Sequence, residues 1–122
     1  MIGKQNFENL NAWKKARELC LCCYKLVKRF PAEERFGLSG QLKRAAVSIP
    51  SNIAEGYSRK SVKDSSHFFN IAMGSIYEVI TQVDIATELG YIDLKDKEEL
   101  LVMCNESLKL INGFLNFKKN NE

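Results

Sequence analysis

The chain has 122 residues, of which 45% are hydrophobic, and its formal net charge at pH 7 is +3. This length and composition suit one domain with a real core, so neither disorder nor a disulfide scaffold is needed to explain the chain. No apolar run reaches the roughly 18 residues of a membrane span, and residues 1–6 lack the apolar stretch of a secretory signal. We therefore expect a cytoplasmic protein that does not enter a membrane.

The first helical pattern covers residues 11–30. Its apolar residues recur at alternating spacings of three and four, which is the seam of an antiparallel bundle: Trp13, Ala16, Cys20, Cys23, Val27 and Phe30. Asn11 can cap the helix, because its side chain can accept a bond from a free backbone amide. Pro31 ends the helix, because it disfavours the α conformation at the preceding residue.

The second pattern covers residues 39–57 and has one apolar face, made of Leu38, Leu42, Ala45, Ile49 and Ile53. Pro50 lies inside it. Because proline removes one backbone hydrogen bond and crowds the carbonyl four residues earlier, we predict a kink at Pro50. Gly56 then allows the chain to leave the helix.

The third and fourth patterns cover residues 62–89 and 94–117. Ser61 with Asp64 resembles a capping box, Gly90 suits a left-handed C-cap, and Asp93 can cap the fourth helix. The two seams are Phe69, Ala72, Ile76, Val79, Val83 and Ala86, and then Leu101, Cys104, Leu108, Ile111 and Leu115. Short connections between helices of similar length force antiparallel neighbours. The sequence therefore predicts an all-α, up-down-up-down antiparallel four-helix bundle, as a single domain spanning residues 1–122.

Beside the seam of the third helix runs a second stripe with a polar middle. If this stripe is partly buried, its carboxylate needs a cationic or donor partner, so we predict a contact between Arg44 and Glu78. The alternative is that the stripe faces solvent. The predicted structural polar network is Gln41, Arg44, Asn52, Glu55, Ser75, Glu78 and Gln82.

Further apolar residues lie off the seams: Ala12, Leu19, Leu26, Met73, Tyr77, Ile80, Leu110, Phe114 and Phe117. A monomeric four-helix bundle needs only about three of every seven positions apolar. The surplus indicates another packed surface, and self-association is the simplest explanation.

The four cysteines are Cys20, Cys22, Cys23 and Cys104, and His67 is the only histidine. Cys20 and Cys23 have C-x-x-C spacing, but no second pair follows at zinc spacing. We expect small core or boundary residues, and we predict neither a metal site nor a cofactor.

The charge is unevenly distributed. Residues 1–63 carry 13 Lys and Arg against 5 Asp and Glu, whereas residues 64–122 carry 5 against 10. Basic side chains bind phosphates without reading base sequence, so the first half suits a polyanion. The candidate nucleic-acid-binding residues are Lys14, Lys25, Lys28, Arg29, Lys43, Arg59, Lys60 and Lys63. Two alternatives stay open: the lysines are solvated helix faces, or the two halves neutralise each other.

Residues 41–57 read QLKRAAVSIPSNIAEGY, which closely resembles the signature of the 23S rRNA intervening-sequence proteins. The resemblance extends from about residue 7 to residue 115. It implies an antiparallel bundle and a homo-oligomer, with a ring of five subunits favoured. The accessory proteins of diversity-generating retroelements form a related group. This group resembles the same bundle, assembled as a basic pentamer that binds nucleic acid and a reverse transcriptase.

We therefore expect a non-catalytic oligomer that binds nucleic acid, RNA rather than DNA being favoured, through the basic first half. The alternative is an adaptor or scaffold that recruits an acidic protein partner. An enzyme is poorly supported, because the sequence has no Gly-rich phosphate loop, metal cluster or nucleophile–histidine pair.

Overall fold

The computed structural model describes residues 6–121, and within that range every regular element is a helix. Two short 3-10 helices, η1 (Asn6–Asn9) and η2 (Ala32–Glu34), accompany four long ones: α1 (Asn11–Val27), α2 (Leu38–Ser58), α3 (Val62–Glu88) and α4 (Leu94–Asn120). The predicted all-α four-helix fold is confirmed. The expectation made for the N-terminus falls largely on residues 1–5, which lie outside the described range.

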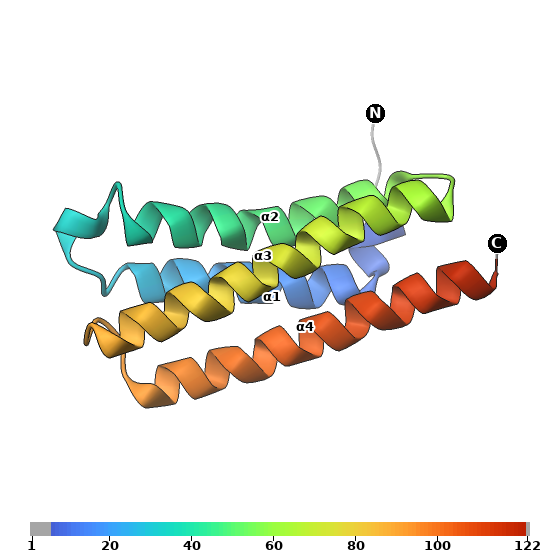
Figure 1. Cartoon of the computed structure of the whole chain (residues 1–122). Coiled ribbons are helices and arrows are strands. Elements are labelled where there is room, and N and C mark those ends of the chain that lie inside the picture. Colours follow the sequence, from blue (N-terminus) through green and yellow to red (C-terminus); the bar gives the residue numbers. More distant parts are fainter. Residues whose placement is uncertain (1–5, 122) are drawn as a thin grey trace.

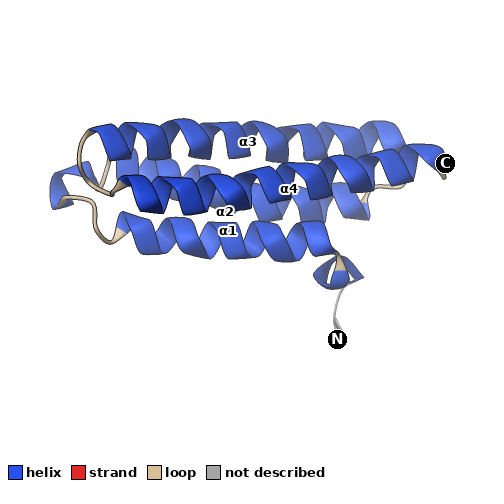
Figure 2. Cartoon of the chain, turned by 90° about the horizontal axis from the view of Figure 1, so that it is seen from below, coloured by secondary structure: helices blue, strands red, loops and turns tan. Residues whose placement is uncertain are grey.

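The four long helices lie side by side, and the chain reverses direction at each connection (Figure 1). Neighbours contact one another around the bundle, with α1 on α2, α2 on α3, α3 on α4, and α4 on α1. Figure 2 shows α4 between α3 and α1, as these contacts require. One end of the bundle, the α1–α2 end, holds the α1–α2 and α3–α4 connections. The opposite, α2–α3 end holds the start of α1, the α2–α3 connection and the end of α4 (Figure 1).

The core follows the predicted seam most closely in α3. All six predicted seam residues of this helix are buried: Phe69, Ala72, Ile76, Val79, Val83 and Ala86. They meet Leu42, Ala45, Ile49 and Ile53 of α2, which are also buried. Because a regular spacing of three and four keeps these side chains on one face, the periodicity alone was enough to identify this part of the core.

In α1 and α4 the buried face is shifted from the prediction. Leu19 is fully buried whereas Cys20 and Trp13 are only partly buried, so Ala12, Ala16 and Leu19 form the face of α1 that meets the core. In α4 the buried Ser107 replaces the predicted Leu108. Most of the supposed surplus therefore packs within the bundle itself, and only Tyr77 and Phe117 of those off-seam residues are well exposed.

The helix ends show both confirmed and wrong predictions. α1 ends at Val27, three residues early, because the amides of Arg29 and Phe30 bond back only three residues as the chain approaches Pro31. Leu10 occupies the N-cap position of α1 in place of Asn11, and it has no side-chain cap bond. α4 runs to Asn120, three residues beyond the predicted end.

The other caps follow the sequence. Asp93 and Asp96 form a complete capping box at the start of α4, and the Ser61 hydroxyl accepts the Asp64 amide at the start of α3. Gly90 has a φ of +80°. With this left-handed residue, the amides of Gly90 and Tyr91 reach the carbonyls of Thr87 and Ala86, which is a Schellman ending.

α2 continues through Pro50 to Ser58, and the kink at Pro50 stays a prediction. Near its end, Gly56 lies against the ring of Phe69 so closely that a Cβ atom there would be 2.6 Å from Cε1. Its carbonyl accepts a hydrogen bond of 2.8 Å from the buried Ser65 hydroxyl. These contacts hold the α2–α3 connection, and the basic residues in it, against the bundle.

Candidate nucleic-acid interface

The eight predicted phosphate-binding residues do not form one surface. Lys25, Lys28, Arg29 and Lys43 lie towards the α1–α2 end, whereas Lys14, Arg59, Lys60 and Lys63 lie towards the α2–α3 end (Figure 1). From Lys14 to Lys28 the rise along a helix is about 21 Å at 1.5 Å per residue. The two ends must therefore be considered separately.

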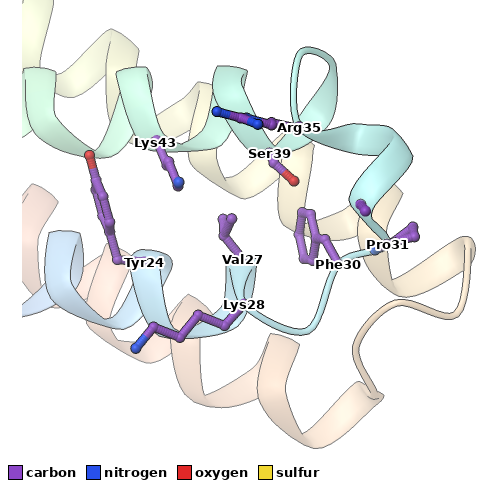
Figure 3. Close-up of a pocket in the computed structure, with 9 residues that line it drawn as sticks. Tyr24, Val27, Lys28, Phe30, Pro31, Arg35, Ser39 and Lys43 are labelled. Atoms are coloured by element: carbon purple, nitrogen blue, oxygen red, sulfur yellow. The ribbon is translucent and has the colours of Figure 1, made fainter.

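At the α1–α2 end, a pocket of about 320 Å³ opens between α1, η2 and the start of α2. Figure 3 shows Tyr24 and Phe30 on either side of Val27, with Lys43 and Arg35 on the α2 side and Lys28 on the α1 side. We call Lys28, Arg35 and Lys43 the basic rim. All three are exposed, and no acidic residue lines the pocket. The pocket thus combines apolar walls with positive charge.

The basic rim has no ion-pair partner among the described residues. The Lys43 ammonium lies 5.5 Å from the centre of the Tyr24 ring, and the Arg35 guanidinium lies 5.2 Å from the centre of the Phe36 ring. Aromatic faces attract cations without neutralising them. The charge of the basic rim therefore stays available to an anion.

Arg35 and Phe36 were not among the predicted site residues. They follow η2, a turn whose geometry the sequence did not indicate, and Phe36 is 89% exposed. The sequence did contain one signal for them: an arginine next to an aromatic residue in a connection between two helices, where binding residues often lie.

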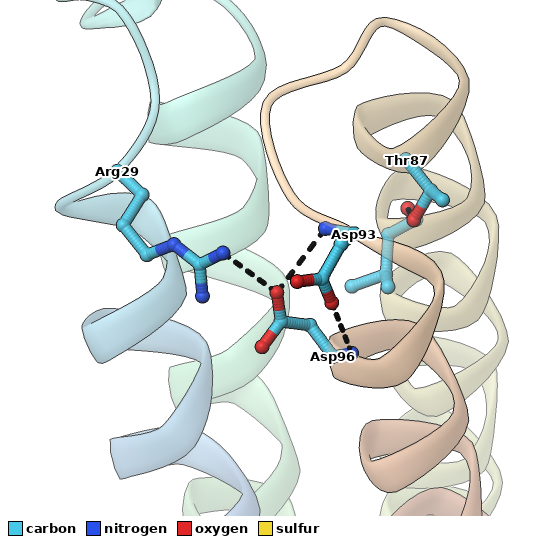
Figure 4. Close-up of polar contacts among 5 residues, drawn as sticks. Arg29, Thr87, Asp93 and Asp96 are labelled. Carbon is cyan, nitrogen blue, oxygen red and sulfur yellow. Dashed lines mark hydrogen bonds and ion pairs between the residues drawn. The ribbon is translucent and has the colours of Figure 1, made fainter.

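Arg29 differs from the basic rim because its charge is neutralised. Its guanidinium lies 2.7 Å from an Asp96 carboxylate oxygen, and that carboxylate also accepts the Asp93 amide (Figure 4). The bond from Arg29 lowers the pKa of Asp96 to about 2, with a smaller contribution from the Asp93 amide. Arg29 therefore joins the end of α1 to the start of α4.

At the α2–α3 end, Arg59 is also engaged. It lies 3.2 Å from the Glu55 carboxylate, and its guanidinium lies 4.7 Å from the centre of the Phe68 ring. Lys60 and Lys63 are exposed and have no ion-pair partner within residues 6–121. Lys118 of α4 donates a bond of 2.9 Å to the Arg59 carbonyl, which adds a cation that the prediction did not include.

The polar network between α2 and α3 is different from the one predicted. Hydrogen bonds join the predicted Asn52 and Ser75 to Ser48: the Asn52 amide donates to Ser48, and the Ser48 and Ser75 hydroxyls bond at 2.8 Å. Ser48 was missed. Glu55 pairs with Arg59 instead.

The predicted Arg44–Glu78 contact is wrong as an ion pair, because the structure has none between these two exposed residues. Both residues line a polar groove of about 260 Å³ between α2 and α3, together with Gln41 and Gln82. The Gln82 Oε1 atom is buried and has no hydrogen-bond partner among the described residues. A long side chain at the edge of a helix interface can reach water, so Glu78 does not need a partner.

The two buried cysteine thiols, Cys23 and Cys104, are poorly suited to reaction. Burial raises the pKa of Cys104 to about 12 and that of Cys23 further above its ordinary value. A protonated thiol is neither a nucleophile nor a good metal ligand. Within residues 6–121, no three His, Cys, Asp or Glu side chains are grouped so that they could hold a metal ion. None of the helices described there is both long and apolar enough to span a membrane.

A family model described as 23S rRNA-intervening sequence protein matches residues 8–113. The chain belongs to this family. The matched region includes all of α1, α2 and α3 and most of α4. It therefore includes both ends of the bundle and the pocket between α1 and α2.

A solved crystal structure shows the same fold as this chain. It is that of a protein of unknown function from the S23 ribosomal protein family of Bacteroides thetaiotaomicron, at 1.70 Å resolution. The two chains share 24% sequence identity with a TM-score of 0.78, over 85% of this chain and 97% of the other. No curated protein matches the sequence.

Proposed function

We propose that this chain is a non-catalytic, homo-oligomeric protein of the cytoplasm that binds nucleic acid, RNA rather than DNA, mainly through its α1–α2 end. One observation carries the proposal: the basic rim has no acidic partner and surrounds an apolar pocket. Each phosphate that binds a lysine or arginine releases condensed counterions, and this release drives binding without a base-specific contact.

The candidate residues differ in whether an acidic side chain already neutralises their charge. Arg29 and Arg59 already contact carboxylates, so a phosphate would have to compete with Asp96 or Glu55 for them. Lys28, Arg35 and Lys43 have no such competitor. Lys60 and Lys63, at the opposite end, supply a second and weaker attachment point.

Self-association would strengthen such binding. Large apolar side chains remain exposed on all four long helices, including Leu21, Val47, Tyr77 and Phe117. Exposed apolar surface of this kind favours contact with further copies, and the family resemblance favours five. Repetition of the basic rim around an oligomer raises avidity without requiring a strong single site.

The test is fluorescence anisotropy with the nuclease-treated protein, a labelled structured RNA and a duplex DNA of equal length, in about 50 and 200 mM salt. We expect RNA binding that weakens steeply with salt. The variant Lys28→Gln/Arg35→Gln/Lys43→Gln should bind weakly. The matched control Arg17→Gln/Lys95→Gln/Lys109→Gln removes the same charge from exposed sites without ion pairs and should bind almost normally. Equal losses in both variants would refute the α1–α2 end as the binding surface.

The second candidate function is an adaptor for an acidic protein partner. The 89% exposed Phe36 beside Arg35 favours it, because exposed aromatics and arginines are typical anchors of protein interfaces. A partner that remains bound to the protein after nuclease treatment, and is lost from Phe36→Ser, would favour this function. The absence of any RNA binding at low salt would exclude the first one.

A further inference from the structure

The pocket at the α1–α2 end has two aromatic walls. Tyr24, from α1, is 38% exposed, whereas Phe30, in the turn after α1, is 8% exposed and is held by contact with the Tyr91 ring. Val27 lies between them at the base of the pocket (Figure 3). A flat, apolar group entering between the two rings would meet aromatic and aliphatic surface on three sides.

The charged side chains that line this pocket all carry positive charge. The basic rim approaches it from both helices, and the lining includes no carboxylate. Glu33 and Glu34 of the adjoining η2 do not line the pocket, and Glu34 is directed elsewhere: its Oε1 accepts the Leu38 amide at 3.0 Å and its Oε2 accepts the Tyr91 hydroxyl at 2.8 Å. A ligand for this site therefore needs an anionic group attached to a flat, apolar one.

We propose that the pocket holds one unstacked nucleotide, with its base between Tyr24 and Phe30 and its phosphate against the basic rim. This inference rests on the proposed function, and it explains how a protein without a recognition motif would prefer single-stranded RNA. Only an unpaired base can leave its stack and pack on an aromatic side chain. The volume, about 320 Å³, is at the lower limit of small-ligand pockets, which suits one nucleotide rather than a folded strand.

The first experiment compares a labelled single-stranded RNA with a duplex RNA of equal length. The change Tyr24→Leu removes the ring from a partly exposed position and keeps apolar volume there, so the fold should persist, as circular dichroism can check. Loss of one base–aromatic stack should weaken single-strand binding by between about fivefold and a hundredfold, with little effect on the duplex. Tyr24→Phe, which keeps the ring, should bind normally.

The control is Tyr77→Leu, the same change at an exposed tyrosine of α3 that does not line the pocket. If Tyr24→Leu and Tyr77→Leu bind single-stranded RNA as tightly as the unmodified protein does, the pocket assignment is overturned while RNA binding through the basic rim stands.

The second experiment needs no polymer. Adenosine 5′-monophosphate, titrated into the ¹⁵N-labelled protein, should shift the amide signals of Tyr24, Val27 and Lys43, whereas ribose 5-phosphate, which lacks the base, should shift them much less. Such shifts in a protein that binds no RNA would support the pocket and refute the proposed function. Absence of shifts, together with normal RNA binding by Tyr24→Leu, would refute the pocket alone.

Discussion

Gly56 offers a sharp test of how α2 and α3 pack. A Cβ atom at this position would lie 2.6 Å from Cε1 and 2.8 Å from Cδ1 of Phe69, and 3.2 Å from Cβ of Phe68. The Phe69 ring is 1% exposed and packs edge-on against Phe114, so it has no free space into which to move. Gly56→Ala must therefore force the two helices apart or push the ring off its rotamer.

Two effects oppose each other in Gly56→Ala. Replacing glycine by alanine inside a helix gains at most about 1 kcal/mol, and less near a helix end. Overpacking of a rigid core costs about 1–3 kcal/mol. We therefore expect the free energy of unfolding to fall by about 1 kcal/mol, which lowers the melting temperature by roughly 4 °C for a domain of this size.

The measurement is urea unfolding followed by circular dichroism at one fixed protein concentration, because self-association would otherwise change the apparent stability. The matched controls are Gly74→Ala and Gly113→Ala, both inside helices with nothing within 4 Å of the added Cβ. These two should be stabilised by about 0.5–1 kcal/mol. If Gly56→Ala is as stable as the controls, the close packing of Phe69 on α2 is wrong.

Three further predictions concern pH, a buried hydroxyl and the basic rim. The pKa of Asp96 is lowered to about 2, so its contribution to stability is present above the unfolded pKa near 4 and is lost as the pH falls through 2. Thermal unfolding of Asp96→Asn should therefore show a smaller loss of melting temperature between pH 5 and pH 2 than the unmodified protein does. The Ser107 hydroxyl is buried without a partner among the described residues, so Ser107→Ala should raise the free energy of unfolding by about 1 kcal/mol in urea, and destabilisation would contradict this. In anisotropy titrations, neutralising Lys28, Arg35 and Lys43 one at a time should each reduce the salt slope of RNA binding by about 0.7–0.9, and an unchanged slope would mean that the residue meets no phosphate.

The sequence predicted the core where one apolar stripe had no competitor. The stripe beside the α3 seam has a polar middle, so only the seam is apolar along the whole helix, and every predicted residue of the seam is buried. α1 carries two adjacent apolar stripes, and periodicity could not distinguish Leu19 from Cys20 as the residue that faces the core. That choice depends on how α2 and α4 pack against α1, which is a property of the assembled bundle.

The candidate site was harder to predict for the same reason. Helix periodicity placed Glu78 beside the α3 seam, but its long side chain reaches the surface whereas the short Ser48 and Ser75 pair across the α2–α3 contact. Arg29 and Asp96 are distant in sequence, so no local pattern could show that they form an ion pair. Helix periodicity cannot place Arg35 at the pocket, because Arg35 follows the short turn η2 and lies in no long helix.

The pairing of charges explains why the basic surface lies where it does. Two ion pairs join the halves of the chain, and both reach α4: Lys15 of α1 lies 2.9 Å from Glu106, and Arg29, in the turn after α1, lies 2.7 Å from Asp96. The acidic second half thus neutralises α1 on the side that faces α4. On the other side α1 meets α2, which also belongs to the basic half, and no ion pair joins these two helices within residues 6–121. Positive charge therefore remains on the α1–α2 face, beside the aromatic pocket, because the order of helices around the bundle leaves it there.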